Sequence, residues 1–357
     1  MTLKIGILEG DDIGLEVVPE CVKVMKAAAG AVGLDVDWRP IPIARKAHDQ
    51  LGHTLPPGTL ETLEKLDGWI LGPIGHREYP RNDPTWVNAH PVFRKHFQFY
   101  ANYKPYLSYA NLPSVYKDID LLFLRETTEG FKVDGNLFRG YGEVMPTSDM
   151  AIGICVTTRL KSRLIAEAAF EAARHAKRRK VTAVHKDTVY RWGDGLFAEE
   201  CRKVARNFPE IEFEEVIVDT FAMRLVMKPQ QYDVIVTTNL YGDILTDQAA
   251  GLVGGLGLAP GLNASETLAM AQATHGSAPD IAGKDLANPY AMIMSGKMLF
   301  DWLALKRNEP KAVEAGTRIG RAMERVIAEA RHLTRDVGGN AGTCEMGDAV
   351  ANAIAKS

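Results

Sequence analysis

Short apolar runs alternate with amphipathic stretches along this chain, and the two patterns predict different secondary structure. The run Leu3–Leu8 ends in a Gly- and Asp-rich turn, and apolar residues with helical spacing follow as far as Ala29, which predicts a strand, a turn and a helix. A longer helical pattern covers residues 158–180 and ends in basic residues, which favour a helix C-terminus. Further strands are predicted at Gly68–Leu71, 120–124, 181–184, 216–218 and Val234–Thr237. Strands separated by helices predict an α/β fold with largely parallel pairing.

The length and the glycine distribution predict two domains. The chain has 357 residues, about twice the ~150 residues of a typical domain. Residues 251–261 contain five glycines and one proline, which suits a hinge or a crossing between domains better than a regular helix. No Gly-x-Gly-x-x-Gly sequence follows a strand, so a standard Rossmann dinucleotide site is not expected.

Charge and composition exclude several classes of protein. The chain carries 42 Lys and Arg against 45 Asp and Glu, a net charge of −3, without a block of like charges, so nucleic acid is not an expected partner. No apolar run reaches the ~18 residues of a membrane span, and residues 1–12 do not have the pattern of a secretion signal. Four scattered cysteines match neither a zinc motif nor a disulfide framework. We therefore expect a protein of the reducing cytoplasm.

Polar residues that are expected to face a ligand site follow three predicted strands. The polar residues at their carboxyl ends are His185, Lys186, Asp187, Asp219 and Asn239. In open α/β sheets, ligands bind outside these strand ends. Asp243 and Asp247 follow four residues apart, which places both carboxylates on one face of a helix. Oxygen ligands without His or Cys suit Mg²⁺ or Mn²⁺, whereas the structural alternative is a helix cap at Asp243 and a solvated Asp247.

A second set of candidate residues is cationic, namely Arg94, Lys95, Lys104, Arg125 and Lys132. Arg94 and Lys95 lie in a segment with helical spacing, where a solvated helix face is the alternative explanation. Arg125 directly follows a buried-looking strand, so exposure explains it poorly, although pairing with Glu126 or Glu129 would. Because guanidinium groups bind carboxylates bidentately, the functional interpretation is a small polyanionic substrate.

The third set lies in residues 274–283, a loop-forming sequence that is followed by Asn288 and Pro289. Small residues allow the backbone to approach a ligand closely, and His275 offers a flat ring for stacking. By itself this segment indicates only a turn.

Taken together, these motifs resemble the β-decarboxylating dehydrogenase family, which includes isocitrate, 3-isopropylmalate, homoisocitrate and tartrate/D-malate dehydrogenases. The likeness covers nearly the whole chain. It rests on GDDIGLE (10–16), FRK (93–95) with ANYKP (101–105), RETTEG (125–130), HK (185–186), VDT (218–220), NLYGDILTD (239–247), HGSAPDIAG (275–283) with NP (288–289), and DVGGNAGT (336–343).

The resemblance implies a fold and an assembly that composition alone does not. It implies two α/β domains, distinct from the Rossmann fold, with the active site in the cleft between them. Residues 1–100 and 254–357 would form a large cofactor-binding domain. Residues 101–253 would form a smaller dimerisation domain that carries metal and catalytic residues. It also implies a homodimer with shared active sites, in which each subunit contributes Lys186 and Asp219 to the site of its neighbour.

The same resemblance implies NAD-dependent oxidation of a 2-hydroxy acid followed by loss of CO₂. Asp219, Asp243 and Asp247 would hold Mg²⁺ or Mn²⁺ against the substrate oxygens, and Lys186 would take or relay the hydroxyl proton. The substrate carboxylates would be held by Arg94, Lys104 and Arg125. The adenosine half of NAD would be bound by His275, Gly276, Ser277, Ala278, Asp280 and Asn288. A carboxylate at Asp280 repels the 2′-phosphate of NADP, which favours NAD.

Two residues depart from the family pattern inside the substrate site. Lys104 occupies a position that is usually arginine, which replaces a bidentate fork by a point charge. Lys132 replaces the usual tyrosine that protonates the carbon left by decarboxylation. Lys132 could act as the acid, or Tyr141 or a water could replace it, or it could pair with an extra anionic group. We therefore hypothesise weak or altered decarboxylation, or oxidation without it.

The segment that sets substrate preference in this family, residues 87–91 here, also differs from the family pattern. Val87 replaces the glutamate of isopropylmalate dehydrogenases, His90 and Pro91 replace their two leucines, and Asn88 replaces the serine of isocitrate dehydrogenases. A malate- or tartrate-like diacid is therefore the expected substrate, with isopropylmalate or isocitrate as the alternative. A non-catalytic regulatory homologue is the alternative from another class, but such chains tend to lose the acidic ligands or the lysine that this chain retains.

Overall fold

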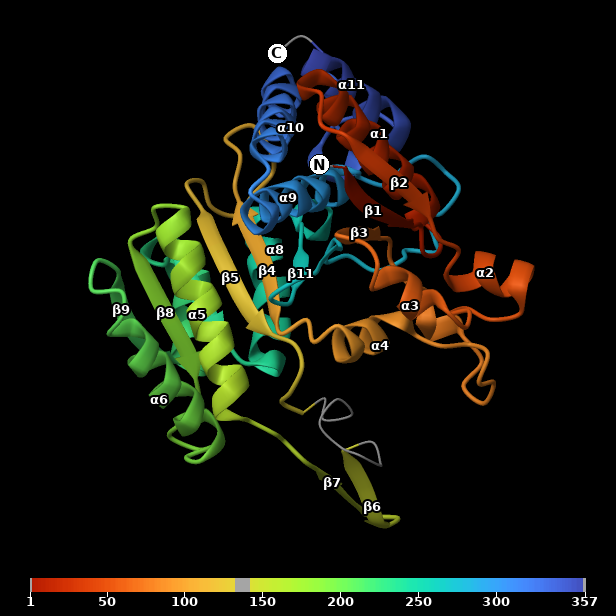
Figure 1. Cartoon of the computed structure of the whole chain (residues 1–357). Coiled ribbons are helices and arrows are strands. Elements are labelled where there is room, and N and C mark those ends of the chain that lie inside the picture. Colours follow the sequence, from red (N-terminus) through yellow and green to blue (C-terminus); the bar gives the residue numbers. More distant parts are fainter. Residues whose placement is uncertain (1, 132–141, 356–357) are drawn as a thin grey trace.

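One large sheet runs through the computed structural model, which describes residues 2–131 and 142–355 (Figure 1). Within these residues the sheet has ten strands, in the order β2-β1-β3-β12-β11-β4-β5-β10-β8-β9. In that order they are Val36–Pro40, Leu3–Leu8, Gly68–Leu71, Ala269–Ala271, Leu262–Ala264, Ala101–Leu107, Asp120–Glu126, Val234–Thr237, Lys180–His185 and Glu212–Ile217. A separate antiparallel hairpin, β6 (Glu143–Thr147) with β7 (Met150–Gly153), projects from the body of the molecule (Figure 1).

Most neighbouring strands are parallel, as the alternation of strands and helices predicts. The exceptions lie in the middle of the sheet, where β4 is antiparallel to β5 and β11, and β11 is antiparallel to β12. The register pairs Arg125 of β5 with Thr237 of β10, and Thr237 with Val184 of β8. The carboxyl ends of β5, β10, β8 and β9 therefore lie along one edge, which brings together the residues that follow them.

Helices cover both faces of the half of the sheet that contains β10. Helices α5 (Arg159–His175) and α6 (Gly193–Ala205) pack on one face, and α7 (Val218–Met227) and α8 (Asn239–Val253) pack on the other. Val234 and Val236 of β10 join the core under α5 and α6, while Ile235 joins the core under α7 and α8. This alternation follows from the two-residue period of a strand.

The other half of the sheet is covered by helices from both ends of the chain. Helices α1 (Gly14–Val32), α9 (Tyr290–Arg307), α10 (Pro310–Glu329) and α11 (Thr343–Ala355) share one core. A smaller core includes residues from around α2 (Ala44–Leu51), α3 (Thr59–Leu63) and α4 (Ala89–His96). Short 3₁₀ turns are η1 (His76–Glu78), η3 (Pro229–Gln231), η4 (Leu256–Leu258) and η5 (Arg335–Val337). Across the described parts of the chain, no helix has the length and apolarity that a membrane crossing needs.

Several boundaries differ from the sequence prediction by a few residues, and three of them are informative. The helix predicted for residues 158–180 ends at His175, because Lys177 adopts a φ of 55° and the Arg178 amide donates to the Ala173 carbonyl, so the chain turns into β8. The strand predicted for residues 216–218 ends at Ile217, and Val218 begins α7. Within 251–261, the first three residues belong to α8, and a Cβ at Gly254 would lie 2.6 Å from the Pro113 carbonyl oxygen.

The buried clusters bear on the expected domains. Two clusters draw on residues between 101 and 259, and two draw mainly on the residues before and after that stretch. The predicted division into 1–100 with 254–357 and 101–253 rests on the family resemblance and stays a prediction.

Candidate active site

Buried cations meet at the edge of the sheet where β4 and β5 adjoin. Arg125 is at the end of β5 and is 2% exposed, and Lys104 on β4 is 5% exposed. Arg94 reaches the same region from the last turn of α4. Lys95, its neighbour on that helix, is exposed. The structure thus brings together the three residues for which substrate binding is predicted.

Arg125 is fixed by the helix that follows β10. Its guanidinium donates to the Asn239 side-chain oxygen at 2.7 Å and to a carboxylate oxygen of Asp243. A Cβ at Gly242 would lie only 2.5 Å from Arg125 Cγ, so α8 can approach the arginine this closely only with glycine there. Asn239 is among the polar strand-end residues that the sequence predicts to face a site, and here it holds Arg125. Gly242 was not predicted, although it lies in the NLYGDILTD motif.

The three cations perturb one another. Burial, and then the charge of Arg125, lower the pKa of Arg94 to about 10. Burial and Arg125 also lower the pKa of Lys104 to about 7, although Asp243 and Asp247 oppose the shift. Lys104 Nζ donates to the Thr246 hydroxyl at 2.9 Å, and Asp243 and Asp247 act on it through their charge, without a hydrogen bond to its amine in the described chain. A buried cation with only a neutral partner is costly, and an anionic ligand would relieve that cost.

Asp243 and Asp247 lie one turn apart on α8, as their spacing predicts. The Asp243 side chain is 45% exposed and pairs with Arg125. Burial, and less strongly the neighbouring Asp243, raise the pKa of Asp247, which Lys104 and Arg125 partly offset. These two carboxylates therefore share one electrostatic environment with the cations.

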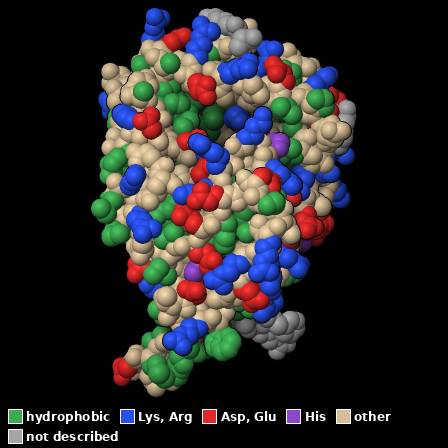
Figure 2. Space-filling view, turned by 90° about the vertical axis from the view of Figure 1, so that its left-hand side faces the viewer, with side chains coloured by type: hydrophobic (Ala, Val, Ile, Leu, Met, Phe, Trp, Pro, Cys, Tyr) green, Lys and Arg blue, Asp and Glu red, His purple; other side chains and the backbone are tan. Residues whose placement is uncertain are grey.

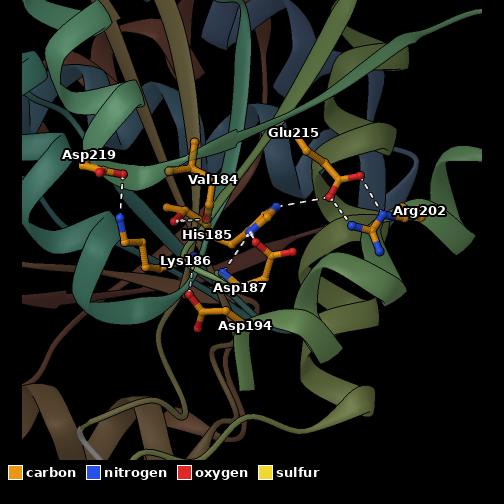
Figure 3. Close-up of polar contacts among 9 residues, drawn as sticks. Val184, His185, Lys186, Asp187, Asp194, Arg202, Glu215 and Asp219 are labelled. Atoms are coloured by element: carbon orange, nitrogen blue, oxygen red, sulfur yellow. Dashed lines mark hydrogen bonds and ion pairs between the residues drawn. The ribbon is translucent and has the colours of Figure 1, made fainter. Parts of the chain in front are cut away.

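Lys186 and Asp219 form a second group at the ends of β8 and β9 (Figure 3). Lys186 Nζ lies 2.8 Å from an Asp219 carboxylate oxygen, and the Asp219 side chain is 65% exposed. The hydrogen bond from Lys186 lowers the pKa of Asp219. The Lys186 amide donates to Asp194 at 2.5 Å, which fixes the backbone of the turn after β8.

The strand end before Lys186 is held by a further network. His185 is buried, and its Nε2 lies 3.2 Å from a Glu215 carboxylate oxygen (Figure 3). Arg202 donates to both oxygens of Glu215 at 2.7 Å. This bidentate pair anchors the end of β8. His185 and Asp187 are polar residues that the sequence predicts to face a site, and in the structure His185 lies between Glu215 and Asp187.

The two groups do not form a complete metal site within one chain. In the two stretches that the structure covers, no three His, Cys, Asp or Glu side chains are grouped so that they could hold a metal ion. Asp219, Asp243 and Asp247 therefore do not form such a group within one copy of the described chain. Lys132 and Tyr141 lie outside the described residues.

The predicted cofactor residues lie in the loop between β12 and α9. His275 Nδ1 is 3.0 Å from the Gly276 carbonyl, its buried Nε2 has no partner in the described chain, and burial lowers its pKa. Asp280 is exposed, and its carbonyl accepts from Lys284 Nζ at 2.7 Å. Asn288 accepts from the Tyr290 amide and donates to Asp336, so it holds the turn before α9, which begins at Tyr290. Gly276, Ser277 and Ala278 complete the loop, and Ala278 has a φ of 44°.

A cavity of about 300 Å³ lies beside these strand ends. Its walls include Glu126, Glu129, Asp194, Asn239 and Tyr241. Burial raises the pKa of Glu129 to about 7. Because Asp194 and Asn239 also hold Lys186 and Arg125, the cavity adjoins both groups of candidate residues.

Comparison with known proteins gives one consistent result. Residues 4–350 match the model of the isocitrate/isopropylmalate dehydrogenase family. The 3-isopropylmalate dehydrogenase of Methanothermobacter thermautotrophicus is 35% identical over 350 residues, 98% of either chain. The isocitrate/homoisocitrate dehydrogenase of Thermus thermophilus is 37% identical over 354 residues, 99% of either chain. The crystal structure of isocitrate dehydrogenase from Methylococcus capsulatus has a TM-score of 0.86 and 37% identity, and the match covers 99% of both chains.

Proposed function

This chain belongs to the isocitrate/isopropylmalate dehydrogenase family, and from that premise we propose that it oxidises a 2-hydroxy diacid with NAD and Mg²⁺ or Mn²⁺, with loss of CO₂. One observation carries the substrate class: Arg94, Lys104 and Arg125 converge in a buried region, and Lys104 has no carboxylate partner within the described residues. A small molecule with two or more carboxylates supplies the missing anions.

The residues present fit the divalent ion in part. Asp243 and Asp247 offer carboxylate oxygens one helical turn apart, the ligand type that Mg²⁺ and Mn²⁺ prefer. Asp219 would be the third ligand. If Asp243 binds the ion, Arg125 loses its ion-pair partner, and a substrate carboxylate then becomes the replacement. The cation cluster and the metal ligands thus favour the same polyanionic substrate.

The cofactor loop fits a dinucleotide. The Nε2 of His275 is buried and has no partner among the described residues, and Asp280 presents an exposed carboxylate that suits ribose hydroxyls and repels a 2′-phosphate. When bound, NAD supplies the two-electron oxidant and the divalent ion supplies an electrophile for the substrate oxygens. Lys186 is the group that takes or relays the hydroxyl proton, and its ion pair with Asp219 holds its amine in place.

The substrate side of α4 favours a polar substituent. His90 lies one turn before Arg94 on this helix, so both side chains share a face. His90 Nε2 is 2.7 Å from Gln272 Nε2, and such a polar pair is a poor lining for an isopropyl group. We therefore favour a malate- or tartrate-like diacid. Isopropylmalate and isocitrate are the second candidates, because relatives with about a third of residues identical carry those names.

The separation of the two candidate groups supports a homodimer with shared sites. Lys186 and Asp219 are the half that each subunit would contribute to the other. Exposed apolar side chains lie on α7, on α8 and on the hairpin that extends from the bottom of the molecule in Figure 2. They include Met223, Met227, Ile244, Met145 and Ile152. A second copy would remove this apolar surface from water.

Complementation tests the shared site directly. Lys186→Met and Asp243→Asn should each abolish turnover, and co-refolding the two variants should restore about one quarter of wild-type activity, since half the dimers would hold one intact site of two. Sites built within one chain would leave the mixture inactive. Mixing Lys186→Met with a second Lys186 variant is the matched control, and no activity should return.

A substrate panel tests the proposed reaction. NADH absorbance should rise with Mn²⁺, NAD and malate or tartrate, and less with isocitrate or alkylmalates. If no substrate gave a rise in NADH absorbance, the result would favour a non-catalytic regulatory homologue. The ratio of CO₂ to NADH measures decarboxylation, and the hypothesis that Lys132 weakens it fails if Lys132→Tyr changes neither the rate nor this ratio.

A further inference from the structure

The motif at residues 10–16 has no role in the proposed chemistry. It links β1 to α1, and glycine is required at close contacts within it: a Cβ at Gly10 would lie 2.3 Å from the Pro73 carbonyl oxygen, and one at Gly14 would lie 2.2 Å from the Glu9 carbonyl oxygen. No side chain fits at either position, so the backbone of this turn is tightly packed on both sides.

One side of the motif is anchored to the body of the molecule. Asp11 is 2% exposed and accepts three hydrogen bonds, from the Arg45 amide at 3.0 Å, the Gly75 amide at 2.8 Å and the Tyr79 hydroxyl at 2.6 Å. Asp12 pairs with the Arg45 guanidinium at 2.5 Å. The start of α1 is thus fixed against two other segments of the chain.

The other side of the motif contacts the loop between β12 and α9. The Glu16 carboxylate accepts from the Gly283 amide at 2.6 Å with one oxygen and from the Asp285 amide at 2.9 Å with the other. The Ile13 amide donates to the Ser277 carbonyl at 3.1 Å. These contacts join residues more than 260 positions apart in the sequence.

This loop depends on such contacts for its shape. Residues 272–289 contain no helix or strand, and Ala278, Gly283 and Asp285 all have positive φ, a conformation that short-range preferences do not favour for Ala or Asp. Asp280 lies three residues after Ser277 and three before Gly283, so it is midway between the two attachment points.

We propose that Glu16 is a positioning residue for the dinucleotide: its carboxylate holds the backbone at Gly283 and Asp285 and thereby fixes Asp280 where the adenosine ribose binds. The inference rests on the proposed function, because it assumes that this loop binds the cofactor. A loop that is ordered before binding gives up less conformational entropy when the ligand arrives. Glu16 therefore acts on cofactor affinity and leaves the chemical step unchanged.

The test compares Glu16→Ala, which removes both acceptors, with Glu16→Gln, which keeps one. Fluorescence titration with NADH should give a dissociation constant about tenfold higher for Glu16→Ala and about threefold higher for Glu16→Gln. At saturating NAD, kcat should stay within about twofold, and KM for the hydroxy acid should not change. Glu314→Ala removes a carboxylate from an exposed pair with Arg318 on α10 and is the control for loss of charge.

Hydrogen exchange provides a readout that does not depend on turnover. Without cofactor, Glu16→Ala should exchange faster at residues 277–285 than wild type, while Glu314→Ala should not. If wild type binds NADH and Glu16→Ala binds it equally tightly, the positioning role is refuted and the proposed function stands. The positioning role would also be refuted if Glu16→Ala had a lower melting temperature, a lower kcat, and KM values for NAD and for the hydroxy acid that rose to the same extent. That result would indicate a purely structural role. A wild-type chain that binds no NADH would refute the proposed function itself.

Discussion

Replacing Lys104 by methionine should stabilise the fold while weakening substrate binding. Lys104 is 5% exposed, and burial together with Arg125 lowers its pKa from 10.5 to about 7. The unfolded chain solvates the ammonium freely, so between pH 7 and 10.5 it binds more protons at this residue than the folded chain does. The contribution of Lys104 to the free energy of unfolding is therefore most unfavourable at and below pH 7, and it becomes less unfavourable as the pH rises from 7 to 10.5.

The two pKa values set the size of the effect. The difference between the pKa of Lys104 in the unfolded and in the folded chain lowers the free energy of unfolding by about 4 kcal/mol at pH 7 and by about 2 kcal/mol at pH 9. Methionine fills a similar volume and carries no charge. Lys104→Met should therefore raise the free energy of unfolding, and its advantage over wild type should shrink by about 2 kcal/mol between pH 7 and pH 9.

Urea unfolding at pH 7, 8 and 9 measures this difference, with Lys65→Met, at an exposed lysine, as the control. A stability gain for Lys104→Met that is the same at every pH would refute the argument, and so would a loss of stability at pH 7. The same variant should raise KM for the diacid about 100-fold, because a charged contact to a carboxylate is lost.

Three further predictions concern the remaining parts of the site. Gly242→Ala should lower kcat/KM for the hydroxy acid at least tenfold with little change in KM for NAD, because the added Cβ would displace Arg125. Steady-state kinetics with each substrate varied in turn measures this, and an unchanged kcat/KM would contradict it. Asp280→Lys with Ile281→Tyr should raise the use of NADP relative to NAD, and an unchanged ratio of the two kcat/KM values would count against the cofactor assignment. Chelation of divalent ions by EDTA should abolish turnover and added Mn²⁺ should restore it, whereas activity that persists after dialysis against EDTA would exclude a metal-dependent reaction.

Local sequence patterns predicted much of the fold. The apolar run Leu3–Leu8, the strands Gly68–Leu71 and Val234–Thr237, and the helical face shared by Asp243 and Asp247 all appear as expected. The boundaries that differ lie where a turn is decided by backbone conformation, as at Lys177. Periodicity reports which side of an element is buried, and it carries little information about where the element stops.

The sequence by itself determined the parallel strands named in the sequence analysis, the strand ends that carry chemistry and, through its motifs, the family. Only the tertiary structure decided that Arg125 is held between Asn239 and Asp243, that Lys104 is buried against a threonine hydroxyl, and that Glu16 holds the loop between β12 and α9. The physical reason is distance along the chain. Each of these contacts joins residues more than 100 positions apart, and their energies depend on burial and on the packing of whole elements, which no local pattern encodes.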